Sequence, residues 1–117
     1  VHLRANAARA LGRTGSRAQA PLLLARVTDS REPLRVRQEA ALALSQVGRV
    51  QQVGPLARLL AQLGARKDPQ TAQLRIAVVQ ALGGIGGGAA RKALLHHARR
   101  PLPAAEQAFV RQALAQR

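Results

Sequence analysis

A few side chains in this sequence are of the types that perform chemistry, but their spacing predicts no catalytic site. Ser16, Ser30 and Ser45 stand at expected turns or helix ends, and no Ser-His-Asp or paired-carboxylate arrangement accompanies them. The adjacent His96 and His97 would point about 100° apart on a helix, and no third metal ligand is apparent. We therefore expect no catalytic residue, no metal site and no cofactor.

The glycine-rich run 83–88 has the composition of a phosphate-binding loop without its context. A dinucleotide-binding fingerprint follows a strand, and a nucleotide-binding loop contains Gly-Lys-Ser or Gly-Lys-Thr. Neither is found here. We interpret the run as a loose turn between two helices.

Cationic side chains are the remaining candidates for a functional surface. The sequence has 19 Lys and Arg against 5 Asp and Glu, which gives a formal net charge of +14. Such an imbalance costs self-repulsion and attracts anionic surfaces, so an acidic partner is the first inference. The alternative is a coding bias, because a chain rich in Ala and Arg with only two lysines is typical of a GC-rich gene.

The elements that position these side chains are predicted to be helices. The 117 residues fit one domain, 47% of them are apolar with Ala and Leu dominant, and Cys, Met, Trp and Tyr are absent. The absence of cysteine excludes disulfide and thiolate chemistry but does not fix the compartment; we expect the cytoplasm. The uncharged stretch 78–90 contains five glycines, so no membrane insertion is expected.

One pattern recurs along the chain, with an apolar residue, an arginine and then an alanine-rich segment at 3–12, 36–45, 74–83 and 110–115. The spacings from Arg4 to Arg37, Arg75 and Arg111 are successively 33, 38 and 36 residues. Each complete copy precedes a second apolar segment, at 20–27, 55–63 and 93–98, in which apolar residues recur at helical spacing. Each unit is therefore predicted to be a helical hairpin.

Capping residues set the expected helix boundaries. Asp68-Pro69 is a helix start, Ser16 with Gln19 forms a capping box, and Pro33 and Pro103 mark two further starts. We expect about seven helices, with boundaries uncertain by about two to four residues. They are predicted at 1–13, 17–28, 33–47, 50–64, 69–84, 88–99 and 103–116.

The repeated pattern resembles the HEAT-like repeats of the short bacterial kind known from phycobilin lyases, over nearly the whole chain. The resemblance implies an all-α, right-handed α-solenoid, an armadillo-like superhelix of antiparallel helix pairs. First helices would line its convex side and second helices its concave side. We expect a single domain over 1–117, with repeats at 1–30, 31–67 and 68–101 and a partial repeat at 102–117. Because the sequence begins and stops within the pattern, we expect a segment of a longer array, or end-to-end association through 3–11 or 109–114.

The resemblance also implies a structural role for the repeated arginine, which in this family stacks from repeat to repeat and pairs with an acid in the loop before its helix. Asp29 precedes Arg37, and Asp68 precedes Arg75. The fourth copy has Glu106 instead of a loop Asp, which leaves its pairing open. The expected ladder consists of Arg4, Arg37, Arg75, Arg111, Asp29 and Asp68.

On the second helices, polar and basic residues lie opposite the apolar stripe and would face the concave groove. This candidate binding surface consists of Arg26, Arg58, Gln62, Lys92, His97, Arg99 and Arg100. A solvated basic face is the structural alternative.

Three functions compete at this point. A scaffold that binds an acidic protein is favoured, because the concave surface of a repeat protein is built for contact. A module that binds the phosphate backbone of nucleic acid is the alternative, although base stacking is disfavoured without Trp or Tyr. An enzyme subunit of the phycobilin-lyase kind depends on the resemblance alone.

Overall fold

The computed structural model describes residues 17–64 and 66–116, and these ranges contain six α-helices and no strand. They are α2 (Ala20–Thr28), α3 (Leu34–Val47), α4 (Val50–Leu63), α5 (Pro69–Ile85), α6 (Gly87–Ala98) and α7 (Ala104–Ala115), and a short 3-10 turn, η1 (Arg17–Gln19), precedes α2. The helix expected at 1–13 lies outside the described residues. No described helix is both long and apolar enough to cross a membrane.

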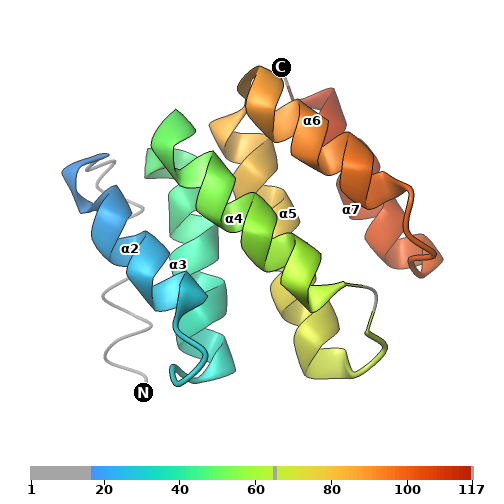
Figure 1. Cartoon of the computed structure of the whole chain (residues 1–117), viewed down its shortest axis with the longest axis horizontal. Helices are drawn as coiled ribbons and strands as arrows, with labels where there is room; N and C mark the ends of the chain where they lie inside the picture. The colour runs from blue at the N-terminus through green and yellow to red at the C-terminus, as the bar shows by residue number, and fades with distance from the viewer. Residues whose placement is uncertain (1–16, 65, 117) are drawn as a thin grey trace.

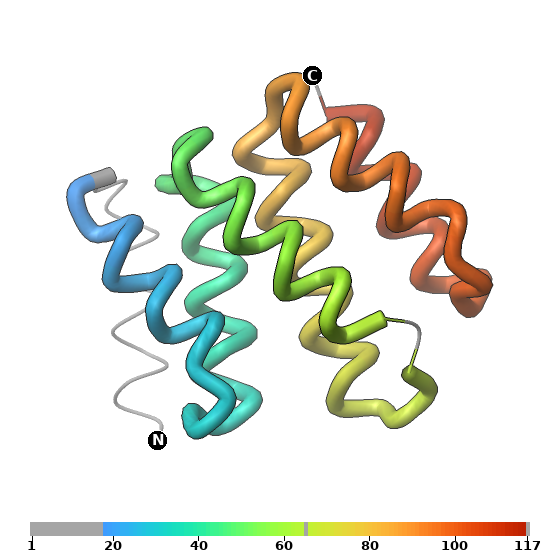
Figure 2. Tube along the Cα trace, in the orientation of Figure 1, coloured from blue at the N-terminus to red at the C-terminus, as the bar shows by residue number. Residues whose placement is uncertain are grey.

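The helices form two layers joined by short connections. Figure 1 shows α2, α4 and α6 in one layer and α3, α5 and α7 in the other. The trace in Figure 2 passes from one layer to the other and back, so that each repeat adds one helix to each layer. Within the described ranges this arrangement confirms the predicted α-solenoid of helix pairs.

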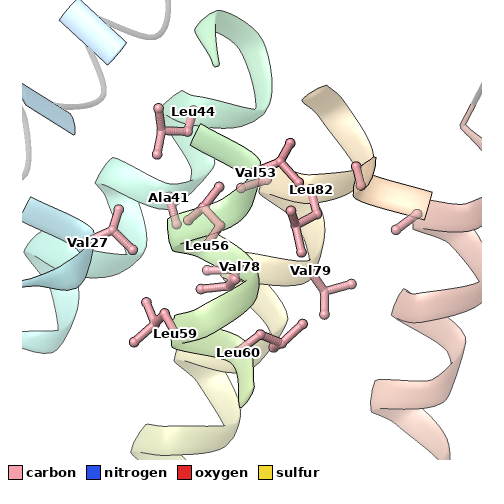
Figure 3. Packing of buried hydrophobic residues seen from close by; sticks show 14 of the residues in the cluster. Val27, Ala41, Leu44, Val53, Leu56, Leu59, Leu60, Val78, Val79 and Leu82 are labelled. Atoms are coloured by element: carbon pink, nitrogen blue, oxygen red, sulfur yellow. The ribbon is translucent and has the colours of Figure 1, made fainter. Parts of the chain in front are cut away.

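Among the described residues, the buried hydrophobic cluster between the layers consists of aliphatic side chains. Val27, Leu44, Leu56 and Leu82 come from four successive helices and are fully buried in it (Figure 3). Alanines fill the narrower spaces, because close-packed interiors leave few voids. Each buried CH₂ contributes about 0.8 kcal/mol, so a core of Ala, Val and Leu stabilises the stack without large aromatic side chains.

The predicted helix starts are confirmed where a capping group is present. The Asp68 carboxylate accepts a hydrogen bond from the Thr71 N–H at 3.0 Å, and Pro69 is the first residue of α5. At the start of α4, Gln52 Oε1 accepts from the Arg49 N–H at 2.7 Å. The expected box of Ser16 with Gln19 includes a residue outside the described ranges. The α-helix there begins at Ala20 rather than 17, after the 3-10 turn.

The glycine run 83–88 contains the predicted turn between two helices, but the turn is tight rather than loose, because most of the run is helical. α5 continues through Ile85 and α6 begins at Gly87, which leaves Gly86 alone between them, with φ at 72°. A Cβ on Gly84 would lie 2.7 Å from Ser45 Cα, and one on Gly83 would lie 2.7 Å from Ala113 Cβ. These two glycines therefore allow α5 to pack closely against α3 and α7.

Candidate functional site

The few acidic side chains of this cationic chain are largely occupied within the molecule. Among the described residues, four ion pairs are seen: Asp29–Arg31, Glu32–Arg26, Asp68–Arg66 and Glu106–Arg75, with N···O distances of 3.1, 3.3, 3.4 and 2.7 Å. Hydrogen bonds from Arg31 hold the pKa of Asp29 below its usual value, and bonds from Thr71 do the same for the pKa of Asp68. Little acid remains to neutralise the other cations.

The pair between Arg75 and Glu106 is buried and bidentate. Arg75 is 1% exposed, and its Nε and Nη2 each donate to a Glu106 carboxylate oxygen at 2.7 Å. Its Nη1 donates to the Arg66 carbonyl at 2.7 Å. One guanidinium thus joins α5 to α7 and to the connection that precedes α5, in the planar geometry that suits arginine.

This geometry corrects the expected pairing of Arg75 with Asp68. Asp68 is engaged as the N-cap of α5, where its Oδ2 accepts from the Thr71 N–H, and its Oδ1 lies 3.4 Å from Arg66 Nε. Glu106, which the sequence placed before Arg111, instead pairs with the arginine of the preceding repeat. The acid therefore comes from the following repeat rather than from the loop before the arginine's own helix.

The other ladder arginines that the structure describes, Arg37 and Arg111, do not repeat this pair. Arg37 Nε donates to the Val27 carbonyl at 2.8 Å, while Asp29 accepts from Arg31. Burial lowers the pKa of Arg37, and the charge of Asp29 opposes this only partly.

The sequence explains why Arg37 lacks a pair of this kind. Glu106 lies five residues before Arg111, whereas the corresponding residue before Arg75 is Gln70, an amide. Arg37 thus finds no matching carboxylate in the next repeat. Arg111 is exposed on α7, and Arg4 lies outside the described residues.

Four residues of the predicted basic surface are exposed. Arg58 and Gln62 are exposed on α4, Lys92 is exposed on the neighbouring α6, and Arg99 is exposed immediately after it. These four residues are called the basic layer face from here on. Arg26 is half-buried and pairs with Glu32, which reduces its availability. Arg100 is half-buried in the connection that follows α6.

His97 does not belong to this surface, so its predicted position was wrong. The residue is 2% exposed, and within the described part of the chain neither ring nitrogen has a hydrogen-bond partner. Burial, reinforced by the charges of Arg100 and Arg75, lowers the pKa of His97 to about 4. The ring is therefore neutral at pH 7 and adds no charge. The signal for its burial was the spacing from Ala90 through Leu94 to His97, which places all three on one face of α6.

A surface hollow of about 300 Å³ lies on the opposite layer. Leu42 of α3, Gln80 of α5 and Phe109 of α7 are among its lining residues, and no charged side chain lines it. This hollow therefore lies on the layer of α3, α5 and α7, away from the second helices that carry the predicted binding surface. Among the described residues, no cluster of three His, Cys, Asp or Glu side chains could hold a metal ion.

Comparison with protein families agrees with this architecture. The sequence pattern of the family described as HEAT repeats matches residues 2–73, which is more than half of the chain. The chain belongs to the HEAT-repeat family. None of the curated proteins compared with it gives a match. HEAT repeats generally serve as protein-interaction scaffolds, and the family is typically non-catalytic.

Proposed function

We propose that this HEAT-repeat protein is a non-catalytic scaffold that binds an acidic protein through the basic layer face. The observation that carries the proposal is the position of Arg58, Lys92 and Arg99. They are exposed on or next to adjacent helices of one layer, while the ion-paired acids engage other arginines. The acids of these ion pairs do not contact Arg58, Lys92 or Arg99, so they would not compete with the carboxylates of a partner.

The physical advantages of this face are attraction at a distance and a rigid support. Like charges on neighbouring helices add their potentials, which raises the rate at which an acidic partner arrives. The cations lie on or beside helices that a close-packed core holds in place, so the backbone loses little conformational entropy on binding. Gln62 offers both a donor and an acceptor beside them.

Binding to the phosphate backbone of nucleic acid is the second candidate, favoured by the net charge of +14. Phosphates would contact the same arginines. The single aromatic residue, Phe109, lies on α7 in the other layer, so it cannot stack on bases at this face. This favours carboxylates on a folded partner over single-stranded nucleic acid.

The test compares two charge-reversal variants of equal charge. Arg58→Glu with Lys92→Glu reverses two of the three cations of the basic layer face. Arg35→Glu with Arg111→Glu makes the same charge change at exposed positions on α3 and α7. Binding of a poly-glutamate peptide and of duplex DNA is measured by fluorescence anisotropy at two salt concentrations. Circular dichroism checks that helix content is unchanged.

We expect the first variant to weaken peptide binding about tenfold, which corresponds to about 1.4 kcal/mol. The control variant should weaken it about two- to threefold, through net charge alone. Equal losses in the two variants would show that this face has no special role. Tighter binding of DNA than of the peptide at both salt concentrations would favour the nucleic-acid alternative.

A further inference from the structure

A second cationic feature lies where the connection from α4 to α5 approaches the connection from α6 to α7. A hollow of about 380 Å³ is lined by residues of both connections and by α5 and α7. Arg66 and Lys67 come from the first connection, and Pro101, Leu102 and Pro103 from the second. We call this hollow the loop-edge site.

The buried pair of Arg75 and Glu106 contributes to the lining and fixes its shape. Arg75 bonds both carboxylate oxygens of Glu106 and also holds the Arg66 carbonyl, each at 2.7 Å. One side chain thereby ties the first connection to α7, the helix that the second connection precedes. Because the pair is mutually neutralised, the charge available to a ligand comes from the exposed cations around it.

Positive charge predominates around the loop-edge site. The Arg66 side chain is 73% exposed and Lys67 is also exposed. Arg99 and Arg100 follow α6, and Arg100 Nη1 lies 4.0 Å from where a Cβ on Gly64 would be. Asp68 is the nearby exposed acid, and it is already engaged by Thr71 and Arg66. An added carboxylate would therefore improve the local charge balance.

The same hollow has an apolar wall. Pro101 and Pro103 are exposed on one side, and the half-buried Ala72 of α5 also lines the space. Proline rings are rigid, so they offer apolar contact without a loss of side-chain entropy on binding. A volume of about 380 Å³ lies within the range of about 300–1,000 Å³ typical of ligand pockets.

We propose that the loop-edge site receives a peptide segment of the acidic partner in which a carboxylate stands next to an apolar side chain. The inference rests on the proposed function and names the segment that would give it specificity. The carboxylate would contact Lys67 and Arg66, and the apolar side chain would lie against Pro101 and Ala72. A nucleic-acid phosphate satisfies the cations but brings no matching aliphatic group, so the peptide is favoured.

The test uses three probes and three variants. The probes are a short peptide of Asp and Glu with one central Leu, the same peptide with Ser in place of Leu, and a single-stranded oligonucleotide of equal charge. Lys67→Glu reverses a lining charge, and Ala72→Gln fills the hollow without changing charge. Arg35→Glu, on the exposed side of α3, is the control with the same charge change as Lys67→Glu. Urea denaturation checks that each variant is folded.

We expect the Leu peptide to bind about five- to tenfold more tightly than the Ser peptide, as partial burial of one aliphatic side chain in an open hollow predicts. Lys67→Glu should weaken both peptides about tenfold, as for loss of a close charge contact, and Arg35→Glu about twofold. Ala72→Gln should remove the difference between the two peptides. Each affinity is measured by titration calorimetry or anisotropy.

Equal affinity of the Leu and Ser peptides would overturn the inference, because the apolar wall would then contribute nothing. So would an oligonucleotide that binds most tightly and loses as much as the peptides with Lys67→Glu. Failure of the proposed function is distinguishable from both. In that case Arg58→Glu with Lys92→Glu would weaken peptide binding no more than Arg35→Glu with Arg111→Glu does, while Lys67→Glu still weakens it about tenfold.

Discussion

Arg75 and Glu106 form a buried ion pair, whose energetic importance differs from that of the exposed pairs. Breaking a buried pair by removing one partner leaves a desolvated charge without compensation, whereas an exposed pair contributes about 0–1 kcal/mol. Arg75 is 1% exposed, and its three hydrogen bonds are each 2.7 Å long. Removal of one partner of this pair should therefore cost more than removal of one partner of an exposed pair.

We predict that Arg75→Ala lowers the free energy of unfolding by about 3–5 kcal/mol, because Glu106 would be left buried and unpaired. Arg37→Ala is the matched control. It removes one hydrogen bond, to the Val27 carbonyl, and should cost about 1–2 kcal/mol. Replacing Arg75 and Glu106 together by Leu should restore much of the loss. Urea denaturation provides the values. Equal costs for Arg75→Ala and Arg37→Ala would contradict the assigned importance of the pair.

The family resemblance implied that the repeated arginine pairs with an acid in the loop before its helix, but Arg75 meets Glu106 instead. Asp68 stands in the expected loop, yet it caps its own helix, and a capping bond three residues away forms more readily than a distant pair. Glu106 is 31 residues from Arg75, and only the packing of α7 on α5 brings the two together. His97 could have been assigned correctly from its spacing to Ala90 and Leu94.

At the scale of the elements, capped helix starts were predictable because their signals are local. Pro69, Pro33 and Pro103 restrict the backbone at or beside the first turn, and the observed helices begin within a residue of each. Glycine gives no such guidance. Gly83 and Gly84 suggested a turn, but the absence of a side chain serves equally for the close approach of two helices. Only the packed structure separates these two uses.

We predict opposite effects for two glycine-to-alanine changes in the same run. The Cβ of Gly84→Ala would lie 2.7 Å from both Ser45 Cα and Ser45 Cβ, so α3 and α5 must separate, at a cost of about 1–3 kcal/mol. The Cβ of Gly88→Ala meets nothing within 4 Å, so the helix should gain about 0.5–1 kcal/mol. Thermal unfolding followed by circular dichroism ranks the two. A neutral Gly84→Ala would show that the close packing of α3 on α5 is not limiting.

For the molecule as a whole, the excess of positive charge acts on folding and on binding in opposite directions. The molecule measures 35 × 30 × 20 Å, and the Debye length is about 30 Å at 0.01 M salt but about 10 Å at 0.1 M. At low salt each cation therefore repels those across the whole fold, whereas at higher salt only neighbours interact. The same screening weakens attraction to an acidic partner.

We predict that raising the salt concentration from about 0.01 M to about 0.1 M increases the Tm while it weakens binding of the acidic peptides. Arg58→Glu with Lys92→Glu is the control, because each change subtracts two charges and the net charge falls from +14 to +10. With less self-repulsion to screen, this variant should show a higher Tm at low salt and a smaller gain on addition of salt. Circular dichroism melts and anisotropy titrations in the same buffers measure both effects.

A Tm that falls as salt is added would mean that attraction within pairs such as Arg26–Glu32 outweighs the repulsion among the exposed cations. In that case the excess charge would not destabilise the fold.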